Sequence, residues 1–142
     1  EMLRSLVGSE MCIRDSKTGG ASGPYPYAGG LRWKVDATQA KGARASNVEV
    51  FDGATRTWGP LNLTKTYRLF VLSFNATGGD GYTTLANVPE ARRSDVGVQD
   101  ADVLQSYIDS LPRNGAGLPV MSRLDASLYS TQSFIGPVAP PK

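Results

Sequence analysis

A glycine-rich loop that directly follows an apolar segment constrains this chain more than any other feature. Residues 67–74, Tyr-Arg-Leu-Phe-Val-Leu-Ser-Phe, predict a strand buried on both faces. In residues 75–82, Asn-Ala-Thr-Gly-Gly-Asp-Gly-Tyr, the glycines favour positive φ and let a ligand approach the backbone. A loop that presents the Phe74 ring and the Asp80 carboxylate is typical of a site for a flat polar molecule. The alternative is a tight turn, with Phe74 in the core.

The composition excludes several classes of function. The chain has 142 residues, 40% hydrophobic and 20% charged, as expected for one globular domain or part of one. A formal net charge of +2 is too small to predict nucleic-acid binding, and no apolar run is long enough to span a membrane. With no histidine and one cysteine, the chain holds no familiar zinc site and no His-dependent triad. We therefore expect no cofactor in this chain and no hydrolysis by this chain alone.

The two ends of the chain differ from its middle. Residues 1–16 hold the one cysteine and two of the three methionines, and their second half resembles a run found at the ends of metagenomic reading frames. We interpret residues 1–16 as a non-native leader and residues 17–142 as part of a domain, with its core at about 22–111. Residues 112–142 are rich in glycine and proline, and we expect an extended tail there, interrupted by a last strand within 121–129.

The pattern between these ends predicts strands. Residues 31–36 alternate apolar and polar side chains, which indicates a half-buried strand with Trp33 inside. Residues 46–51 predict a second strand. The Asp-Gly pair at 52–53 predicts a two-residue hairpin turn, after which residues 55–58 return as the partner strand.

One helix is expected, at residues 100–111. Apolar residues recur there at helical spacing, Asp100 is suited to the N-cap, and Pro112 stops the helix. Together with the strands, this helix predicts an α/β fold of the mixed, α+β-like kind, with strands packed against a C-terminal helix.

The loop and its surroundings resemble the C-terminal domain of the 5′-nucleotidase family, which includes bacterial UDP-sugar hydrolases. Phe-Asn-Ala-Thr-Gly-Gly-Asp-Gly-Tyr at 74–82, after Lys-Thr-Tyr-Arg at 65–68, looks like the hallmark of that domain. The likeness runs from Ser-Gly-Pro-Tyr-Pro at 22–26 to about Leu111. It implies the second half of this domain, a periplasmic or extracellular location, and a partner metallophosphoesterase domain with two divalent metals outside this chain.

The same resemblance implies roles for individual residues. Phe74 matches the ring that stacks on the nucleobase of a nucleotide substrate, and Asp80 matches the carboxylate that accepts hydrogen bonds from the ribose hydroxyls. The further substrate-binding residues that it implies are Asn75, Gly78, Gly79 and Gly23. The opposing phenylalanine and the arginines of the family have no counterpart here. Ile-Arg-Asp at 13–15 resembles one family segment, but its surroundings differ, so we do not assign Arg14 to the site.

Two other functions stay open. A free-standing sugar- or nucleoside-binding module would present Tyr25, Tyr27, Trp33 and Trp58 as one exposed stacking surface. A purely structural β-rich domain would bury Phe74. The exposure of these rings distinguishes the three interpretations.

Overall fold

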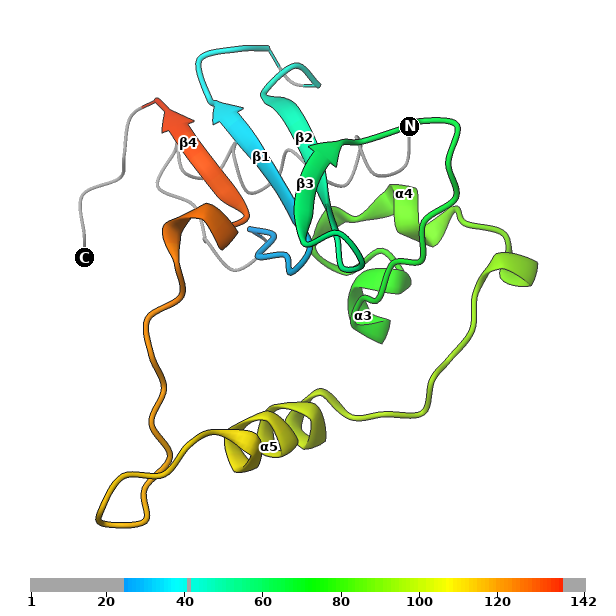
Figure 1. Cartoon of the computed structure of the whole chain (residues 1–142). Coiled ribbons are helices and arrows are strands. Elements are labelled where there is room, and N and C mark those ends of the chain that lie inside the picture. The colour runs from blue at the N-terminus through cyan, green and yellow to red at the C-terminus, as the bar shows by residue number, and fades with distance from the viewer. Residues whose placement is uncertain (1–24, 41, 137–142) are drawn as a thin grey trace. The chain divides into compact units, whose positions relative to one another are not determined.

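The computed structural model describes residues 25–40 and 42–136, in which a four-stranded mixed sheet is combined with short helices (Figure 1). This confirms the mixed α/β fold class. The proposed leader at 1–16 and the candidate residue Gly23 lie outside the described residues. The chain divides into two compact units, Glu1–Val88 with Asp125–Lys142 (unit 1) and Pro89–Leu124 (unit 2).

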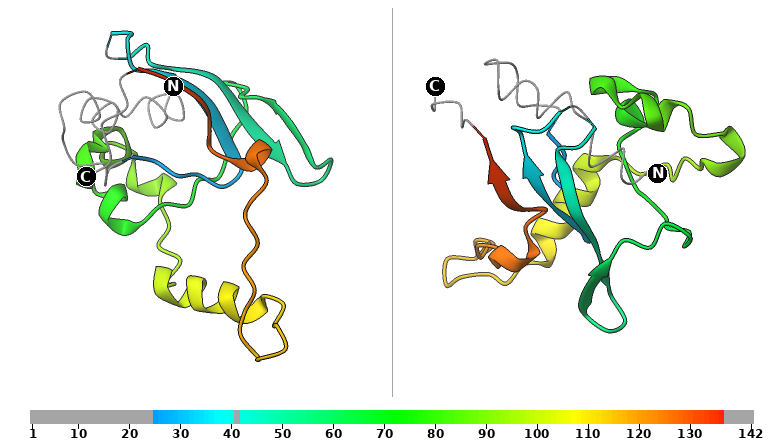
Figure 2. Two further views of the ribbon diagram at one scale, coloured as in Figure 1. Left: turned by 90° about the vertical axis from the view of Figure 1, so that its left-hand side faces the viewer. Right: turned by 90° about the horizontal axis from the view of Figure 1, so that it is seen from above.

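The sheet belongs to unit 1 and has the strand order β3-β2-β1-β4 (Figure 2). Its strands are β1 (Leu31–Asp36), β2 (Ala45–Asp52), β3 (Thr57–Pro60) and β4 (Thr131–Ile135). β2 pairs antiparallel with both β1 and β3, whereas β4 pairs parallel with β1. The strands predicted at 31–36 and 46–51 are therefore confirmed.

The core of unit 1 lies on one face of β1. Trp33 is 2% exposed, and Val35 and Ala37 are also buried. Partly buried side chains pack against these three, namely Tyr25, Ala28, Leu31, Ala45 and Val48. Because alternate residues of a strand point to opposite faces, the apolar alternation of β1 places Trp33 inside, as predicted.

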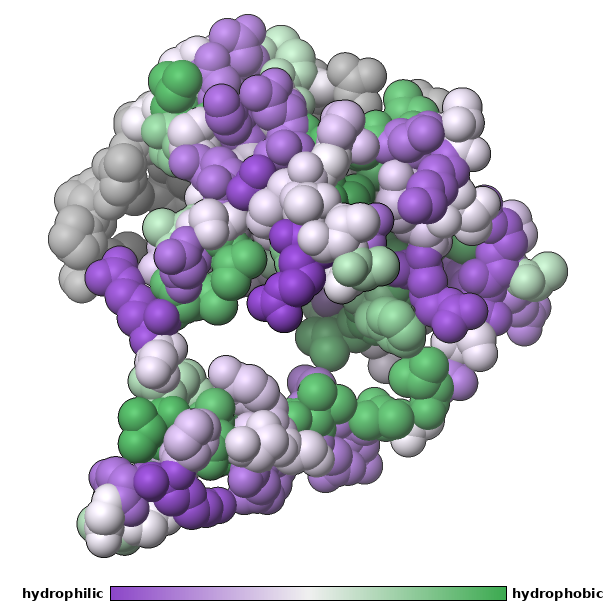
Figure 3. Space-filling view, viewed as in Figure 1, coloured by the Kyte–Doolittle hydropathy of each residue, from purple (hydrophilic) through white to green (hydrophobic). Residues whose placement is uncertain are grey.

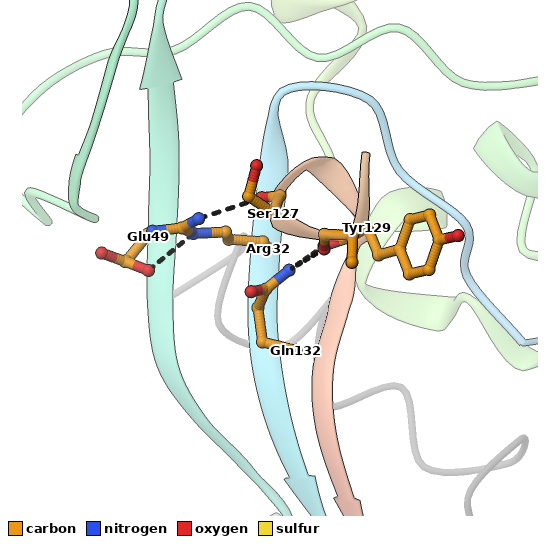
Figure 4. A network of polar contacts seen from close by, with 6 residues as sticks. Arg32, Glu49, Ser127, Tyr129 and Gln132 are labelled. Carbon is orange, nitrogen blue, oxygen red and sulfur yellow. Dashed lines mark hydrogen bonds and ion pairs between the residues drawn. The ribbon is translucent and has the colours of Figure 1, made fainter. Parts of the chain in front are cut away.

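On the other face of β1, Arg32 joins three parts of the chain (Figure 4). Its Nε donates to Glu49 Oε2 on β2 at 2.7 Å, and its Nη1 donates to the Ser127 carbonyl at 3.0 Å. The guanidinium also lies 4.4 Å from the ring centroid of Trp58 on β3. Arg32 is thus both ion-paired to β2 and stacked on an aromatic ring of β3, and these contacts hold the three strands in register. The hydrophobic core packs on the opposite face of β1.

The strand predicted at 67–74 is not formed, and that prediction was wrong. Residues 66–72 lie outside any helix or strand, and the apolar side chains among them are exposed, Phe70 to 70%. An apolar run forms a buried strand only where neighbouring strands or helices cover both of its faces. Among the described residues, none pairs with this segment.

The hairpin between β2 and β3 has a longer turn than the Asp-Gly pair predicts. Asp52 pairs with Thr57, so the turn contains the four residues 53–56. The reason is the Asp52 carboxylate, which accepts a hydrogen bond from the Ala54 N–H at 2.9 Å and stabilises a wider turn. The returning strand consequently begins at Thr57, two residues later than predicted.

The last strand also lies elsewhere than predicted. β4 occupies residues 131–135, which we expected to belong to an extended tail, and no strand forms within 121–129. Pairing with β1 explains its place, because the Trp33 N–H donates to the Ser130 carbonyl at 2.8 Å and the Ala37 N–H to the Ile135 carbonyl at 2.7 Å. Without β4, these donors at the edge of β1 would be unpaired.

Unit 2 contains the predicted helix. α5 spans Asp100–Ser110 and ends before Pro112, as expected. Its N-cap is Gln99 rather than Asp100, so Asp100 lies with Asp102 in the first turn, where the helix dipole stabilises negative charge. Three apolar side chains of α5 are exposed, namely Val103, Leu104 and Tyr107, whereas Ile108 is half-buried; Figure 3 shows hydrophobic residues at the surface of the molecule.

Acid is expected to weaken the turn that leads into β4. Asp125 caps η3 (Ala126–Leu128), accepting hydrogen bonds from the Ser127 hydroxyl and N–H. The Ser127 hydroxyl, and then the Ser127 N–H, lower the pKa of the Asp125 carboxyl below its ordinary value of 3.8. Because the folded pKa is depressed, the stabilisation is complete above 3.8 and is lost as the pH falls below it.

Asp125→Asn keeps a capping oxygen but cannot titrate, so this variant should lose less stability than the wild type between about pH 5 and about pH 3. Denaturant unfolding at both pH values measures the difference. The same loss in both proteins would contradict a role for Asp125.

Candidate functional site

The loop singled out in the sequence forms tight turns between short helices in unit 1. Its elements are α3 (Ser73–Ala76), η1 (Gly79–Gly81) and α4 (Thr83–Ala86). Gly78 has φ +99°, the left-handed conformation that glycine adopts after the C-terminus of a helix, and Gly81 has φ +79°. The prediction that this loop uses positive φ is confirmed.

Phe74 lies on α3 with its side chain 62% exposed. One side of the ring rests against Gly79, because a Cβ built on Gly79 would lie 2.5 Å from the ring atom Cε1. The alternative in which Phe74 belongs to a buried core is therefore wrong for this structure. A ring supported on one side and exposed elsewhere is available for stacking.

Asp80 is exposed and occupies an unusual backbone conformation, φ 55° and ψ 21°. Left-handed backbone costs a residue with a side chain about 1 kcal/mol, although aspartate tolerates it better than most. In the part of the chain that the structure describes, no hydrogen bond or ion pair engages the Asp80 carboxylate, so its acceptor positions are available. Backbone strain beside an unpaired carboxylate is an observation from which a functional role can be argued.

The other predicted residues support this loop in different ways. Asn75 is half-buried, and its backbone carbonyl accepts a hydrogen bond from the Gly78 N–H at 3.0 Å. The structure thus brings Phe74, Asn75, Gly78, Gly79 and Asp80 into one loop, whereas Gly23 lies outside the described residues.

The sequence analysis missed Thr77. Its hydroxyl donates to the Phe74 carbonyl at 2.9 Å and to the Ser73 carbonyl at 3.2 Å, and the Ser73 carbonyl also accepts the Thr77 backbone N–H at 3.1 Å. A threonine directly before the glycine pair was the available signal, since Thr side chains bond to carbonyls three and four residues earlier.

The four rings of the alternative binding module do not form one exposed surface. Trp33 is buried in the core, the Tyr25 hydroxyl is hydrogen-bonded to the Thr131 hydroxyl, and Trp58 packs against Phe51 with ring centroids 5.1 Å apart. Tyr27 is the one large exposed ring of the four. The stacking-surface interpretation is therefore contradicted.

Two further properties follow from the described residues, 25–40 and 42–136. No three acidic, histidine or cysteine side chains among them lie close enough together to hold a metal ion. No helix among them is both long enough and apolar enough to cross a bilayer.

Comparison with known proteins gives the family. The family model described as "5'-nucleotidase, C-terminal domain" matches residues 2–87, more than half of the chain. The chain belongs to this family. The matched range includes residues 2–16 of the segment that the sequence analysis set apart, as well as the whole of the loop that holds Phe74 and Asp80.

Individual relatives agree with this assignment. The chain is 32% identical over 97 residues to "NAD 5'-nucleotidase" of Haemophilus influenzae, and 43% identical over 76 residues to "Protein UshA" of Escherichia coli. These matches cover 66% and 54% of this chain. The crystal structure of a 5'-nucleotidase precursor from Thermus thermophilus matches 76% of the chain with a TM-score of 0.60 and 30% identity.

The chain spans only a small part of each of these relatives, 16% of the Haemophilus protein, 12% of the Escherichia protein and 19% of the Thermus chain. The similarity thus defines a domain family and its fold.

Proposed function

We propose that this chain is the nucleoside-binding part of a 5′-nucleotidase-type hydrolase. Phe74 stacks on the nucleobase, and Asp80 accepts hydrogen bonds from the ribose hydroxyls. One observation carries the proposal, namely that a loop shaped by glycines presents both the exposed Phe74 ring and the exposed, unpaired carboxylate of Asp80. The family assignment and the names of the relatives support it.

The chemistry of the two side chains suits a nucleoside. Stacking of a base on an aromatic side chain contributes about 1–3 kcal/mol and tolerates different bases, because every base has a π-face. An ionised carboxylate only accepts hydrogen bonds, and a ribose offers two neighbouring hydroxyl donors. A base and its sugar therefore match an aromatic ring and a carboxylate that lie on one loop.

Under this proposal, binding and reaction belong to different domains. A metallophosphoesterase domain with two divalent metals would perform the hydrolysis in a longer, periplasmic or extracellular protein. Phe74 and Asp80 would bind the nucleoside end of a nucleotide and so orient its phosphate toward that domain. Holding a substrate in a defined orientation contributes to catalysis without any chemical step in this chain.

Removal of the Asp80 carboxylate should discriminate between sugars. Asp80→Gly is the suitable variant, because glycine accepts the φ of 55° without strain. We expect Asp80→Gly to weaken binding of a ribonucleoside about tenfold, the effect of losing hydrogen bonds to a charged group. Binding of the 2′,3′-dideoxynucleoside should change little, because that ligand presents no hydroxyls there. NMR titration of the 142-residue chain with adenosine and with 2′,3′-dideoxyadenosine measures both affinities.

Asp95→Gly is the matched control. Asp95 is also exposed and accepts a hydrogen bond only from a nearby backbone group, the Gly97 N–H, in unit 2. Asp95→Gly should leave the affinities for adenosine and for 2′,3′-dideoxyadenosine unchanged. An equal loss of adenosine and dideoxyadenosine binding in Asp80→Gly would contradict the contact between Asp80 and the ribose.

A further inference from the structure

Gly79 differs from the other two glycines of the loop. Gly78 and Gly81 have positive φ, which explains glycine at both positions. Gly79 does not have positive φ, so alanine is compatible with its backbone. The backbone conformation therefore gives no reason for glycine at position 79.

The reason lies in the Phe74 ring. A Cβ built on Gly79 would lie 2.5, 2.6 and 2.7 Å from three successive ring atoms, Cε1, Cζ and Cδ1. If this Cβ position lay in the plane of the ring, beyond its edge, it would be clearly closer to one ring atom than to that atom's neighbours. The three distances are nearly equal, so the Cβ position lies over the face of the ring. The Gly79 Cα–H bond in that direction therefore points at one face of Phe74.

We propose that Gly79 is a positioning residue. Its Cα–H packs against one face of the Phe74 ring and fixes the plane on which a nucleobase stacks, and the base binds the opposite face. This inference rests on the proposed function, because it assigns the two faces of the same ring. It adds that the Phe74 ring already has its binding orientation before the ligand arrives. Binding then costs less conformational entropy, because the ring need not be ordered at that step.

Exposure of the ring makes this role separable from folding. Because Phe74 is 62% exposed, a methyl group at position 79 displaces the ring into solvent rather than into a packed core. Gly79→Ala should therefore fold normally, with a melting temperature within about 4 °C of the wild type, while the ring loses its support.

The first test needs no ligand. In the wild-type chain, the Gly79 α-proton that points at the Phe74 ring should resonate upfield of its ordinary position, because it lies over an aromatic face. Phe74→Leu should abolish this shift, whereas Gly53→Ala should leave it unchanged. Gly53 is the matched control position, with no positive φ and no atom within 4 Å of an added Cβ. A Gly79 α-proton shift that is the same in Phe74→Leu would overturn the packing.

The second test is a double-mutant cycle on adenosine affinity. Gly79→Ala should weaken binding about tenfold in the wild-type background, within the range that base stacking spans, and Gly53→Ala should not weaken it. In the Phe74→Leu background, Gly79→Ala should have no further effect, because it acts only through the ring. Equal effects of Gly79→Ala in both backgrounds would show a direct or structural role and overturn the proposal.

The two proposals fail in distinguishable ways. A wild-type chain that shows the upfield shift but does not bind adenosine overturns the proposed function, and with it the positioning of a base. A wild-type chain that binds adenosine with unchanged affinity after Gly79→Ala overturns only the positioning role and leaves the proposed function standing.

Discussion

Phe74→Ala is expected to raise the KM for nucleotides by about one to two decades in an enzyme that carries this domain, the equivalent of about 1–3 kcal/mol of lost stacking. The effect on kcat should be much smaller, because the base lies away from the reacting phosphate and its contact with Phe74 is the same in the ground state and the transition state. Steady-state kinetics with AMP and with ribose 5-phosphate, which has no base, separate the stacking contribution from all others. Ribose 5-phosphate should show no change.

The same substitution should hardly affect folding. A ring that is 62% exposed leaves no large cavity when it is removed, so the free energy of unfolding should change by less than about 1 kcal/mol. A loss of about 3–5 kcal/mol, with unchanged affinity in the protein that remains folded, would show a core residue instead and contradict the binding role.

Trp33→Ala is expected to have the largest effect on stability. Trp33 is 2% exposed and lies at the centre of the small core on β1, so its truncation should cost about 3–5 kcal/mol. Whole domains are stable by only about 5–15 kcal/mol, and this loss removes a large part of that total. Urea unfolding followed by circular dichroism gives the value. Trp58→Ala is the control, because Trp58 is half-buried and contributes mainly its contacts with Arg32 and Phe51. Similar losses in the two variants would show that the core is not centred on β1.

The sequence correctly predicted the strand and the helix whose formation depends mainly on the pattern of side chains within the element itself. The alternation around Trp33 predicted β1 and its buried face, and the apolar spacing before Pro112 predicted α5 to within one residue. In each case the signal and its cause lie in the same short segment, as a side-chain period or a helix stop.

Elements that depend on distant partners were not predictable. β4 forms because backbone N–H groups at the edge of β1 donate to the carbonyls of Ser130 and Ile135. The sequence of residues 131–135 does not indicate that this edge is their partner. The run at 67–74 gave the opposite error, since its composition predicts a strand without supplying the neighbours that a strand needs. Turn length at residues 53–56 was decided by a side chain, the Asp52 carboxylate, rather than by the Asp-Gly pair.

The candidate site was predictable in part. The sequence indicated the loop, its positive φ angles and the pairing of Phe74 with Asp80 on one loop. It did not indicate that glycine 79 faces the ring while glycines 78 and 81 serve the backbone, because this distinction exists only once φ and the position of Phe74 are known.

The exposed segment at 67–72 has a consequence for solubility. Its large apolar side chains are at the surface, and its backbone N–H groups at 68–71 donate to no acceptor in the described part of the chain. Segments with these properties add to one another as strands between molecules. Concentrating the protein is therefore expected to favour self-association, so the fraction of monomeric protein should fall as the total protein concentration rises. A charged residue at Phe70, the most exposed of these side chains, would interrupt such pairing without disturbing the core on β1.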